Sequence, residues 1–314
     1  MMVQMASVLV LILMVLCEGL HLNSARLEGH TALRTSTALT ASHVELATSI
    51  LAPSSLGFWK REYGVSYGYG GSIAAAAALA LRDATNPLGR VHAILHMVYG
   101  LRLCIFLLVR EITVPRFKEV KEKIEKQSPP TRMERLPFIL QCASLYYCMS
   151  LPLYITAQAP RLGKVGEVLA KGSLVTAGLG LAAQIFGDFQ KSFTKWKNPD
   201  RLVTGGFYSV FRHPNYTGEL ILWTMSTVTG LIVASQLPWS LRLVLLSLGS
   251  CLGSVGIAFI LALAATGLEK RQREKYGESE EYKAWVKRTS SGLVLPKKSK
   301  EPYAHEYNEV EDGL

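Results

Sequence analysis

Five polar side chains of different chemistry fall within eight consecutive positions, namely Arg212, His213, Asn215, Tyr216 and Glu219. Imidazole and phenol groups can give or take a proton, while carboxylates and guanidinium groups hold charged or amide partners. Pro214 suits the first turn of a helix, and such a helix places Tyr216 and Glu219 on one face. Because apolar residues follow, Glu219 is expected at membrane depth, where an ionisable group is costly and marks a candidate functional site. A helix end whose charges reach the headgroups is the alternative.

Cations and amides precede this stretch, at Gln190, Lys191, Lys195, Lys197 and Arg201. The Gly205-Gly206 pair allows a tight turn or a close approach of the backbone. Cations beside exposed backbone N–H groups are the partners that a phosphate needs. The segment therefore predicts a site for a phosphate-bearing cofactor at the membrane face, although ordinary basic loops of a membrane protein have the same composition.

A third polar group follows the last apolar segment and begins with Glu269, Arg271 and Arg273. Tyr276, Tyr282 and Trp285 come soon after them. If this tail and the earlier stretch lie on the same side of the membrane, they form one site that the tail closes. A solvated charged helix is the alternative for the tail.

The elements that must position these groups are membrane helices. Of the 314 residues, 49% are hydrophobic and the mean hydropathy is +0.21, which is too apolar for an average soluble domain. Apolar segments lie at 65–81, 88–109, 136–158, 166–187, 218–234 and 241–268. We therefore expect an all-α polytopic membrane bundle of about six spans, with five to seven possible.

Charge alternates between the connections in a way that sets the orientation. The basic segments 110–135, 188–213 and 270–300 fall on one face, whereas 158–166 and 235–240 carry little charge. The positive-inside rule turns the basic face toward the cytosol, so the cofactor pocket is expected there.

Several other classes of function find no support. The net charge of +10 comes without a nucleic-acid-binding motif, so no nucleic-acid partner is expected. The five cysteines form no CxxC pair. His92 and His96 have the spacing of metal ligands on a helix, but no third ligand is evident, and no metal is expected.

Three regions follow from composition. Residues 1–60 read as a signal- or transit-like leader, with an apolar core at 7–17 and an Ala-, Ser- and Thr-rich stretch containing Arg26 and Arg34. Such a leader favours an endoplasmic reticulum or plastid membrane. Residues 61–298 are the membrane domain, and 299–314 form an acidic tail that we expect to be disordered.

The sequence FRHPNYTGELILW resembles the RHPNY-x-GE signature of the DUF1295 proteins, which belong with the steroid 5-alpha-reductase C-terminal and sterol reductase group. YGLRLCIFLLVRE, GDFQKSFTKWK and GLEKRQREKYG resemble further segments of that family, in the same order. The likeness runs from about residue 63 to 296. It implies an NADPH-dependent reductase that saturates a carbon–carbon double bond of a lipid-like substrate, whether steroid, isoprenoid or fatty.

The resemblance also implies roles for residues. It places Gln190, Lys191, Arg212, His213, Asn215, Tyr216 and Glu219 around the cofactor, with Glu269 and Arg271 closing the site from the tail. Arg201, a cation of the preceding basic stretch, is also expected to bind the cofactor. Tyr216 and Glu219 are the expected catalytic groups, and Tyr216 is the best candidate for the proton donor in this stretch. The chain departs from the family pattern at AATGLEK, which lacks the usual proline before the closing glutamate.

Two other functions stay open. Isoprenylcysteine carboxyl methyltransferases carry a similar RHPxYxG motif and use S-adenosylmethionine, but they usually close with a Glu-Glu pair, whereas Lys270 follows Glu269 here. The Gln190-Lys191 segment and Asn215 favour the reductase. A non-catalytic sterol-binding or scaffolding membrane protein is the third possibility.

Overall fold

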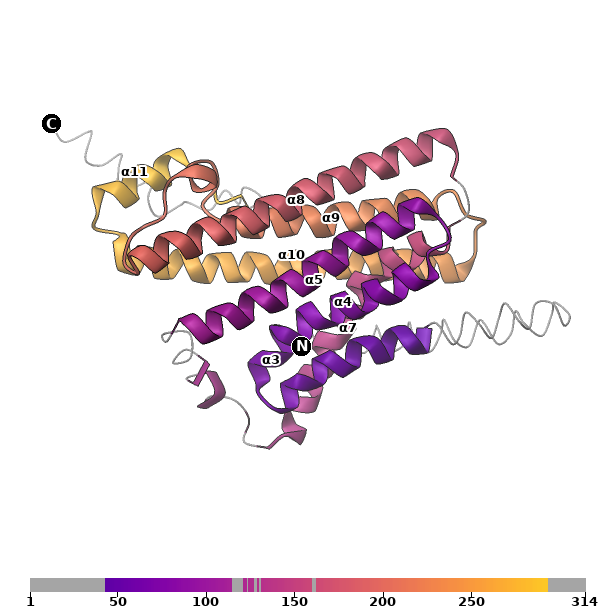
Figure 1. Cartoon of the computed structure of the whole chain (residues 1–314), viewed down its shortest axis with the longest axis horizontal. Coiled ribbons are helices and arrows are strands. Elements are labelled where there is room, and N and C mark those ends of the chain that lie inside the picture. Colours follow the sequence, from indigo (N-terminus) through magenta and orange to yellow (C-terminus); the bar gives the residue numbers. More distant parts are fainter. Residues whose placement is uncertain are drawn as a thin grey trace, which may run out of the picture. The chain divides into compact units, whose positions relative to one another are not determined.

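The computed structural model of the chain is helical and describes residues 43–114, 121–122, 124–126, 129, 131–159 and 162–292 (Figure 1). It divides into two compact units. Unit 1 comprises residues 1–181 and 221–258, and unit 2 comprises residues 182–220 and 259–314. Each unit is described by itself below.

The chain is helical from 43 to 54 and then forms η1 (Ser55–Phe58), α3 (Arg61–Val65), α4 (Tyr67–Asp83), α5 (Pro87–Thr113), η2 (Met133–Arg135) and α7 (Leu136–Ala157). The second half forms α8 (Lys164–Lys197), η3 (Gly206–Ser209), α9 (Pro214–Ala234), α10 (Leu241–Tyr276) and α11 (Glu280–Arg288). Helices α8, α9 and α10 are long and contribute residues to both units.

Five of these helices are long and apolar enough to cross a membrane, namely α5, η2 with α7, α8, α9 and α10. They cover five of the six expected apolar segments, so the chain is a polytopic helical membrane protein. The expected first span at 65–81 is the helix α4, whose 17 residues leave it short of a full span.

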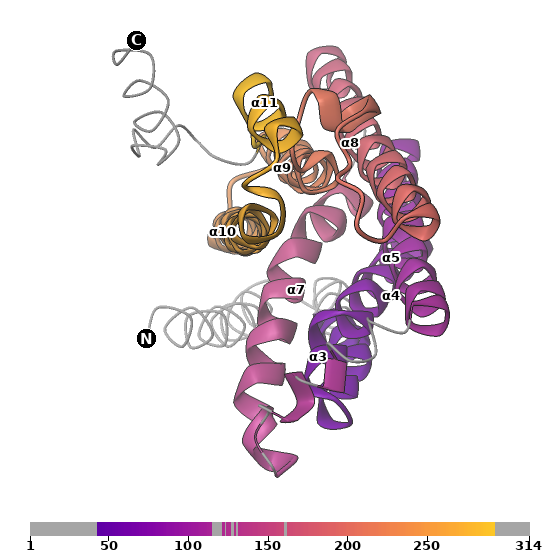
Figure 2. The same ribbon diagram turned by 90° about the vertical axis from the view of Figure 1, so that its left-hand side faces the viewer.

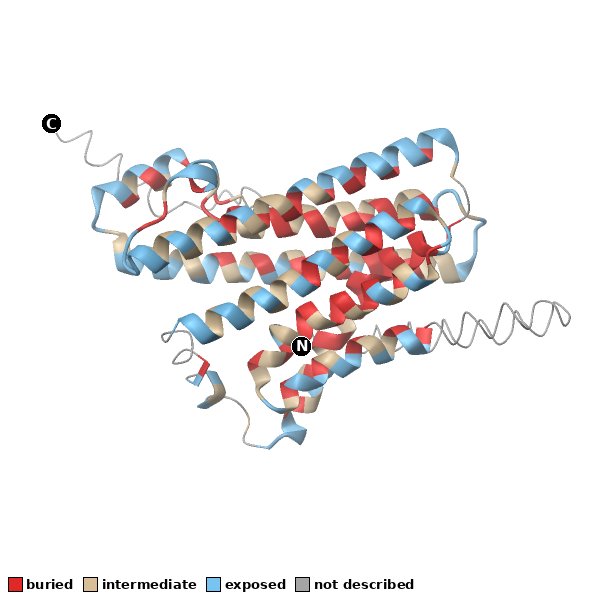
Figure 3. Cartoon of the chain, viewed as in Figure 1, coloured by how far each residue is buried: buried red, intermediate tan, exposed pale blue. Residues whose placement is uncertain are grey.

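In unit 1, α4 lies against α5 and α7 (Figure 2). Helix α7 is the most enclosed element, because every residue from Tyr146 to Ala157 is buried (Figure 3). Gly70 and Gly100 let α4 and α5 approach closely, since a Cβ on Gly70 would lie 2.9 Å from the Gly100 carbonyl oxygen. Small side chains thus bring these helices within backbone contact.

The folded part of unit 1 begins earlier than the leader boundary expected at residue 60. Residues 43–54 are helical, and Leu46 and Ile50, one turn apart, are both buried. His43 Nδ1 lies 2.9 Å from the hydroxyl of Tyr147, and Ser72 donates a 2.8 Å hydrogen bond to the Ile50 carbonyl. Residues 43–58 thus pack with the membrane helices of unit 1, while the domain boundary expected at residue 60 stays a prediction. The expected leader core at 7–17 and acidic tail at 299–314 lie outside the described residues.

Two buried histidines of α5 are tied to neighbouring helices of unit 1. His92 places Nδ1 2.9 Å from the Thr156 hydroxyl and Nε2 2.8 Å from the Ser226 hydroxyl. His96 uses Nδ1 to reach the His92 carbonyl at 3.0 Å. His92 therefore joins α5 to α7 and α9 through neutral hydroxyl groups.

Unit 2 is built from the last turns of α8, the loop with η3, the first turns of α9, the end of α10, and α11. Its small apolar core consists of Leu202, Val203, Tyr208, Tyr282 and Trp285. Helix α11 is capped by Ser279, whose hydroxyl accepts from the Tyr282 N–H. This cap and core hold the tail against the loop that precedes α9.

Candidate functional site

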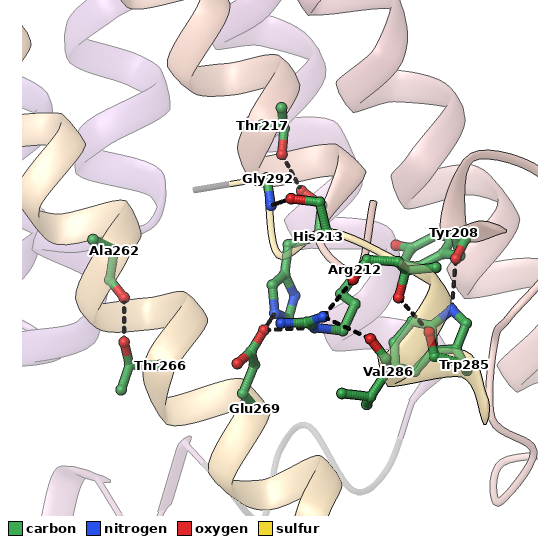
Figure 4. A network of polar contacts seen from close by, with 12 residues as sticks. Tyr208, Arg212, His213, Thr217, Ala262, Thr266, Glu269, Trp285, Val286 and Gly292 are labelled. Carbon is green, nitrogen blue, oxygen red and sulfur yellow. Dashed lines mark hydrogen bonds and ion pairs between the residues drawn. The ribbon is translucent and has the colours of Figure 1, made fainter. Parts of the chain in front are cut away.

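Arg212 and His213 meet Glu269 in unit 2 (Figure 4). Both residues come from the segment just before α9, and Glu269 comes from the end of α10. Arg212 Nε donates to Glu269 Oε1 at 2.9 Å, and His213 Nε2 lies 3.1 Å from the same oxygen. The two polar segments that the sequence placed on one face are thus in direct contact.

The tail closes around Arg212 through its backbone. Arg212 Nη1 donates to the carbonyl of Thr289 at 2.6 Å, and its backbone N–H donates to Ser290 at 2.8 Å. The Ser290 N–H donates a 3.2 Å hydrogen bond to the Val210 carbonyl, and the two bonds form a short parallel β-bridge between Phe211 and Ser290. Trp285, fully buried, donates its indole N–H to the Tyr208 carbonyl at 2.6 Å (Figure 4). The residues after α11 therefore fix the guanidinium in place.

Burying the charged groups of this network is energetically costly. Arg212 is 5% exposed and His213 is 1% exposed, whereas the Glu269 side chain is 34% exposed. A buried cation needs an anion and hydrogen-bond acceptors, and Glu269 with the tail carbonyls supplies both. Since most of the Arg212 donors bond to groups of the protein itself, Arg212 is a structural part of the site. Glu269 is the member with surface open to solvent.

Two amide–carboxylate pairs flank the network. Gln184 Nε2 donates to Glu219 Oε2 at 2.9 Å, and Asn215 Nδ2 donates to Asp188 Oδ1 at 3.0 Å. Gly187 allows the second pair to form, because a Cβ there would lie 3.1 Å from the Asn215 backbone nitrogen. Asp188 lies on α8, and Glu219 lies on α9 and contacts Gln184 of α8. This part of unit 2 is therefore rich in hydrogen-bond acceptors.

Gln184 was missed in the sequence, although a signal was present. It is the one strongly polar residue of the run GLGLAAQIFG, and an amide inside a span marks a candidate site. It is 3% exposed, and its Oε1 atom accepts no hydrogen bond from any described residue. A buried acceptor without a donor costs about 1–3 kcal/mol, which makes Gln184 a candidate site residue.

The loop after α8 is held by Gln190 and shaped by Gly206. Gln190 Nε2 donates to the Gly205 carbonyl at 2.6 Å. Gly206 has φ +57°, a left-handed conformation that favours glycine. The expected tight turn is present, and Gln190 acts on it from the preceding helix.

The other predicted site residues differ in their exposure. Lys191 is half-buried, while Arg201 and Arg271 are exposed. Tyr216 is half-buried, and its ring stacks on His213 with centroids 5.9 Å apart. Tyr208 is buried, which raises the pKa of its phenol, and its hydroxyl donates to the Gly187 carbonyl at 3.2 Å. Of these two phenols, Tyr216 is the one with open surface.

Comparison with known protein families identifies the family of the chain. The model of the family described as "Protein of unknown function (DUF1295)" matches residues 63–289, well over half of the chain. The chain belongs to the DUF1295 family. No curated protein and no solved structure matched it.

DUF1295 membership confirms the resemblance read from the RHPNYTGE motif. The matched region contains all the residues of the Arg212–His213–Glu269 network and the α11 helix that closes it. It begins at Tyr63, so the helical segment before it, from 43 to 58, lies outside the match.

Proposed function

We propose that this DUF1295 protein is an NADPH-dependent membrane reductase that saturates a carbon–carbon double bond of a lipid-like substrate. The observation that carries the proposal is the buried Gln184–Glu219 pair, in the part of unit 2 that is rich in hydrogen-bond acceptors. Gln184 Oε1 lacks a donor among the described residues. The carboxamide N–H group of a nicotinamide is a donor of the required kind. The family resemblance to steroid and sterol reductases points to the same cofactor.

The remaining residues fit the phosphate and ribose portions of such a cofactor. Lys191, Arg201 and Arg271 are cations with partly or fully open surface, as a phosphate partner requires. Asn215 and Gln190 supply amides, and Gly205 leaves open backbone, since no atom lies within 4 Å of a Cβ built there. Glu269 can accept hydrogen bonds from hydroxyl groups through the part of its carboxylate that is exposed.

The protein's own chemistry in this proposal is orientation and proton transfer. The bound cofactor supplies the hydride. Tyr216 holds the substrate oxygen or protonates the carbon that becomes electron-rich, and His213 packs against its ring. Arg212 positions His213 by sharing Glu269 with it. Glu219, buried at 8% exposure, orients Gln184.

The membrane setting supports a proposed substrate class and location. A site among membrane helices receives apolar substrates from lipid, so a steroid, isoprenoid or fatty enone is the expected class. The Ala-, Ser- and Thr-rich leader with Arg26 and Arg34 supports an endoplasmic reticulum or plastid membrane.

Calorimetric titration of the full chain in detergent with NADPH, NADH and S-adenosylmethionine tests the proposal. We expect binding of NADPH and a loss of affinity in Lys191→Ala, Asn215→Ala and Gln184→Leu. The control is Gln236→Leu, an exposed amide in the turn that follows α9. A Gln184→Leu variant with unchanged affinity would contradict the role of its oxygen.

The same titration separates the other classes of function. Binding of S-adenosylmethionine alone would make the protein a methyltransferase. Binding of no cofactor by a folded sample would favour a sterol-binding or scaffolding protein. NADPH binding would justify a screen of enone lipids in which the loss of NADPH absorbance is measured.

A further inference from the structure

One face of α8 exposes apolar side chains along the whole helix. Its first turns expose Val165, Val168, Val175 and Leu179, between 64% and 74% each. Its last turns expose Phe186, Phe189, Phe193 and Trp196, which we call the aromatic stripe. Successive members are three, four or seven residues apart, so they lie on one side of the helix. The lipid-facing side of α8 thus changes from aliphatic to aromatic toward its C-terminal end.

The length of α8 indicates where that change falls in a bilayer. Glu167 and Lys171 form an exposed ion pair at 2.6 Å, which marks one edge of the hydrocarbon. A hydrocarbon layer of about 30 Å is crossed by about 20 helical residues, which places the other edge near Lys191. Phe193 and Trp196 then lie at headgroup level, where aromatic side chains gather in membrane proteins.

The cations of these last turns are not equivalent. Lys195 is held within unit 2, since its Nζ lies 2.7 Å from the Tyr276 hydroxyl and 3.1 Å from the Pro199 carbonyl. Lys197 is exposed, and its Nζ lies 4.4 Å from the centre of the Phe193 ring. No acidic side chain of the described residues pairs with it. Lys197 thus offers a positive charge beside exposed aromatic rings.

We propose that the aromatic stripe and Lys197 bind anionic phospholipids of the cytosolic leaflet. The rings lie at the boundary between acyl chains and headgroups, and Lys197 pairs with the lipid phosphate. The continuity of the stripe with the lipid-facing aliphatic residues of α8 favours lipid as the occupant. Such contacts hold the loop after α8 at the membrane surface. This inference does not depend on the identity of the cofactor.

Lipid-specific fluorescence quenching tests this surface on the full chain in phosphatidylcholine vesicles. Brominated phosphatidylglycerol or brominated phosphatidylcholine is added at equal mole fraction. The signal of Trp196, which is 81% exposed, is the difference between the wild type and Trp196→Phe. We expect the anionic lipid to quench it more strongly, and Lys197→Gln to reduce that preference about fivefold. The control Lys171→Gln, an exposed lysine at the other end of α8, should leave the preference unchanged.

Three results would overturn the proposal. Equal quenching by both lipids would remove the anionic preference. Quenching by aqueous iodide but not by lipid would place the stripe in water. If neither brominated lipid nor iodide quenched Trp196, another protein surface, such as a second copy of the chain, would cover the aromatic stripe. NADPH titration of the same samples is an independent readout, so failure here is distinguishable from failure of the reductase proposal.

Discussion

His92 in unit 1 and His213 in unit 2 are both buried imidazoles, at 0% and 1% exposure, but their partners differ. His92 contacts two neutral hydroxyls, one on α7 and one on α9. His213 shares a single carboxylate oxygen with Arg212. The first arrangement satisfies a polar ring inside a helical bundle. The second concentrates charge beside a carboxylate that is still open to solvent.

This difference separates structural polar groups from candidate functional ones. A hydroxyl–imidazole set is complete within the protein and joins helices. A charged set costs more to bury and needs a compensating role, which we assign to binding. Unit 1 is therefore expected to respond to mutation through stability, and unit 2 through ligand affinity.

The largest effect is expected from Glu269→Gln. Loss of the carboxylate leaves Arg212 buried without its anion, so the variant should lose at least tenfold in NADPH affinity and about 2 kcal/mol of stability. Calorimetry and thermal unfolding in detergent measure the two quantities. Glu274→Gln is the control, because Glu274 is exposed and its ion pair with Lys270 is long, at 4.0 Å, and therefore weak. Equal behaviour of the two variants would contradict a special role for Glu269.

A pair of histidine variants sharpens the comparison between the units. His92→Leu removes the hydrogen bonds to Thr156 and Ser226 and should destabilise the protein by about 1–3 kcal/mol with unchanged NADPH affinity. His213→Leu should weaken NADPH binding beyond any change in unfolding temperature. If His92→Leu lowered the affinity of the folded protein as much as His213→Leu, the division between the units would fail.

Two adjacent glycines of unit 2 should respond in opposite ways. Gly206 has φ +57°, and a Cβ there would lie 2.6 Å from Gln190 Nε2, so Gly206→Ala should cost about 1–2 kcal/mol. Gly205 has φ −95°, and a Cβ there would meet no atom within 4 Å, so Gly205→Ala should be neutral or slightly stabilising. Thermal unfolding of both variants checks the turn, and the reverse order would show that it is wrong.

The smallest effect is expected at the surface of unit 2. Asp200 pairs with Lys275, but its side chain is 78% exposed. Asp200→Asn should change stability by less than about 0.5 kcal/mol, because exposed ion pairs are screened by water and salt. A larger change in unfolding temperature, maintained in high salt, would show that this pair anchors the loop to α10.

Much of the membrane architecture could be predicted, because hydropathy depends only on residue type over a window of known length. The helices α5, α7, α8, α9 and α10 follow from it. The start of the folded part did not follow, since Leu46 and Ile50 are too few to stand out within an Ala-, Ser- and Thr-rich stretch. Helix α4 reads as a span by composition but is too short.

The candidate site was predictable where side chains carry it. The approach of Arg212 and His213 to Glu269 follows from residue type and from the topology of the basic segments. The closure by the tail uses the carbonyls of Thr289 and Ser290, and backbone groups have no signature in residue type. Gln184 was overlooked because a single amide in an apolar run is easily read as part of the span.

We propose that the polar network of unit 2 binds NADPH. Hydrogen exchange of the full chain, followed by mass spectrometry with and without NADPH, tests it most directly. We expect increased protection in peptides covering 184–219 and 269–290, with little change in peptides of α5 and α7. Protection confined to α5 and α7, or no protection at a concentration where binding is saturated, would contradict it.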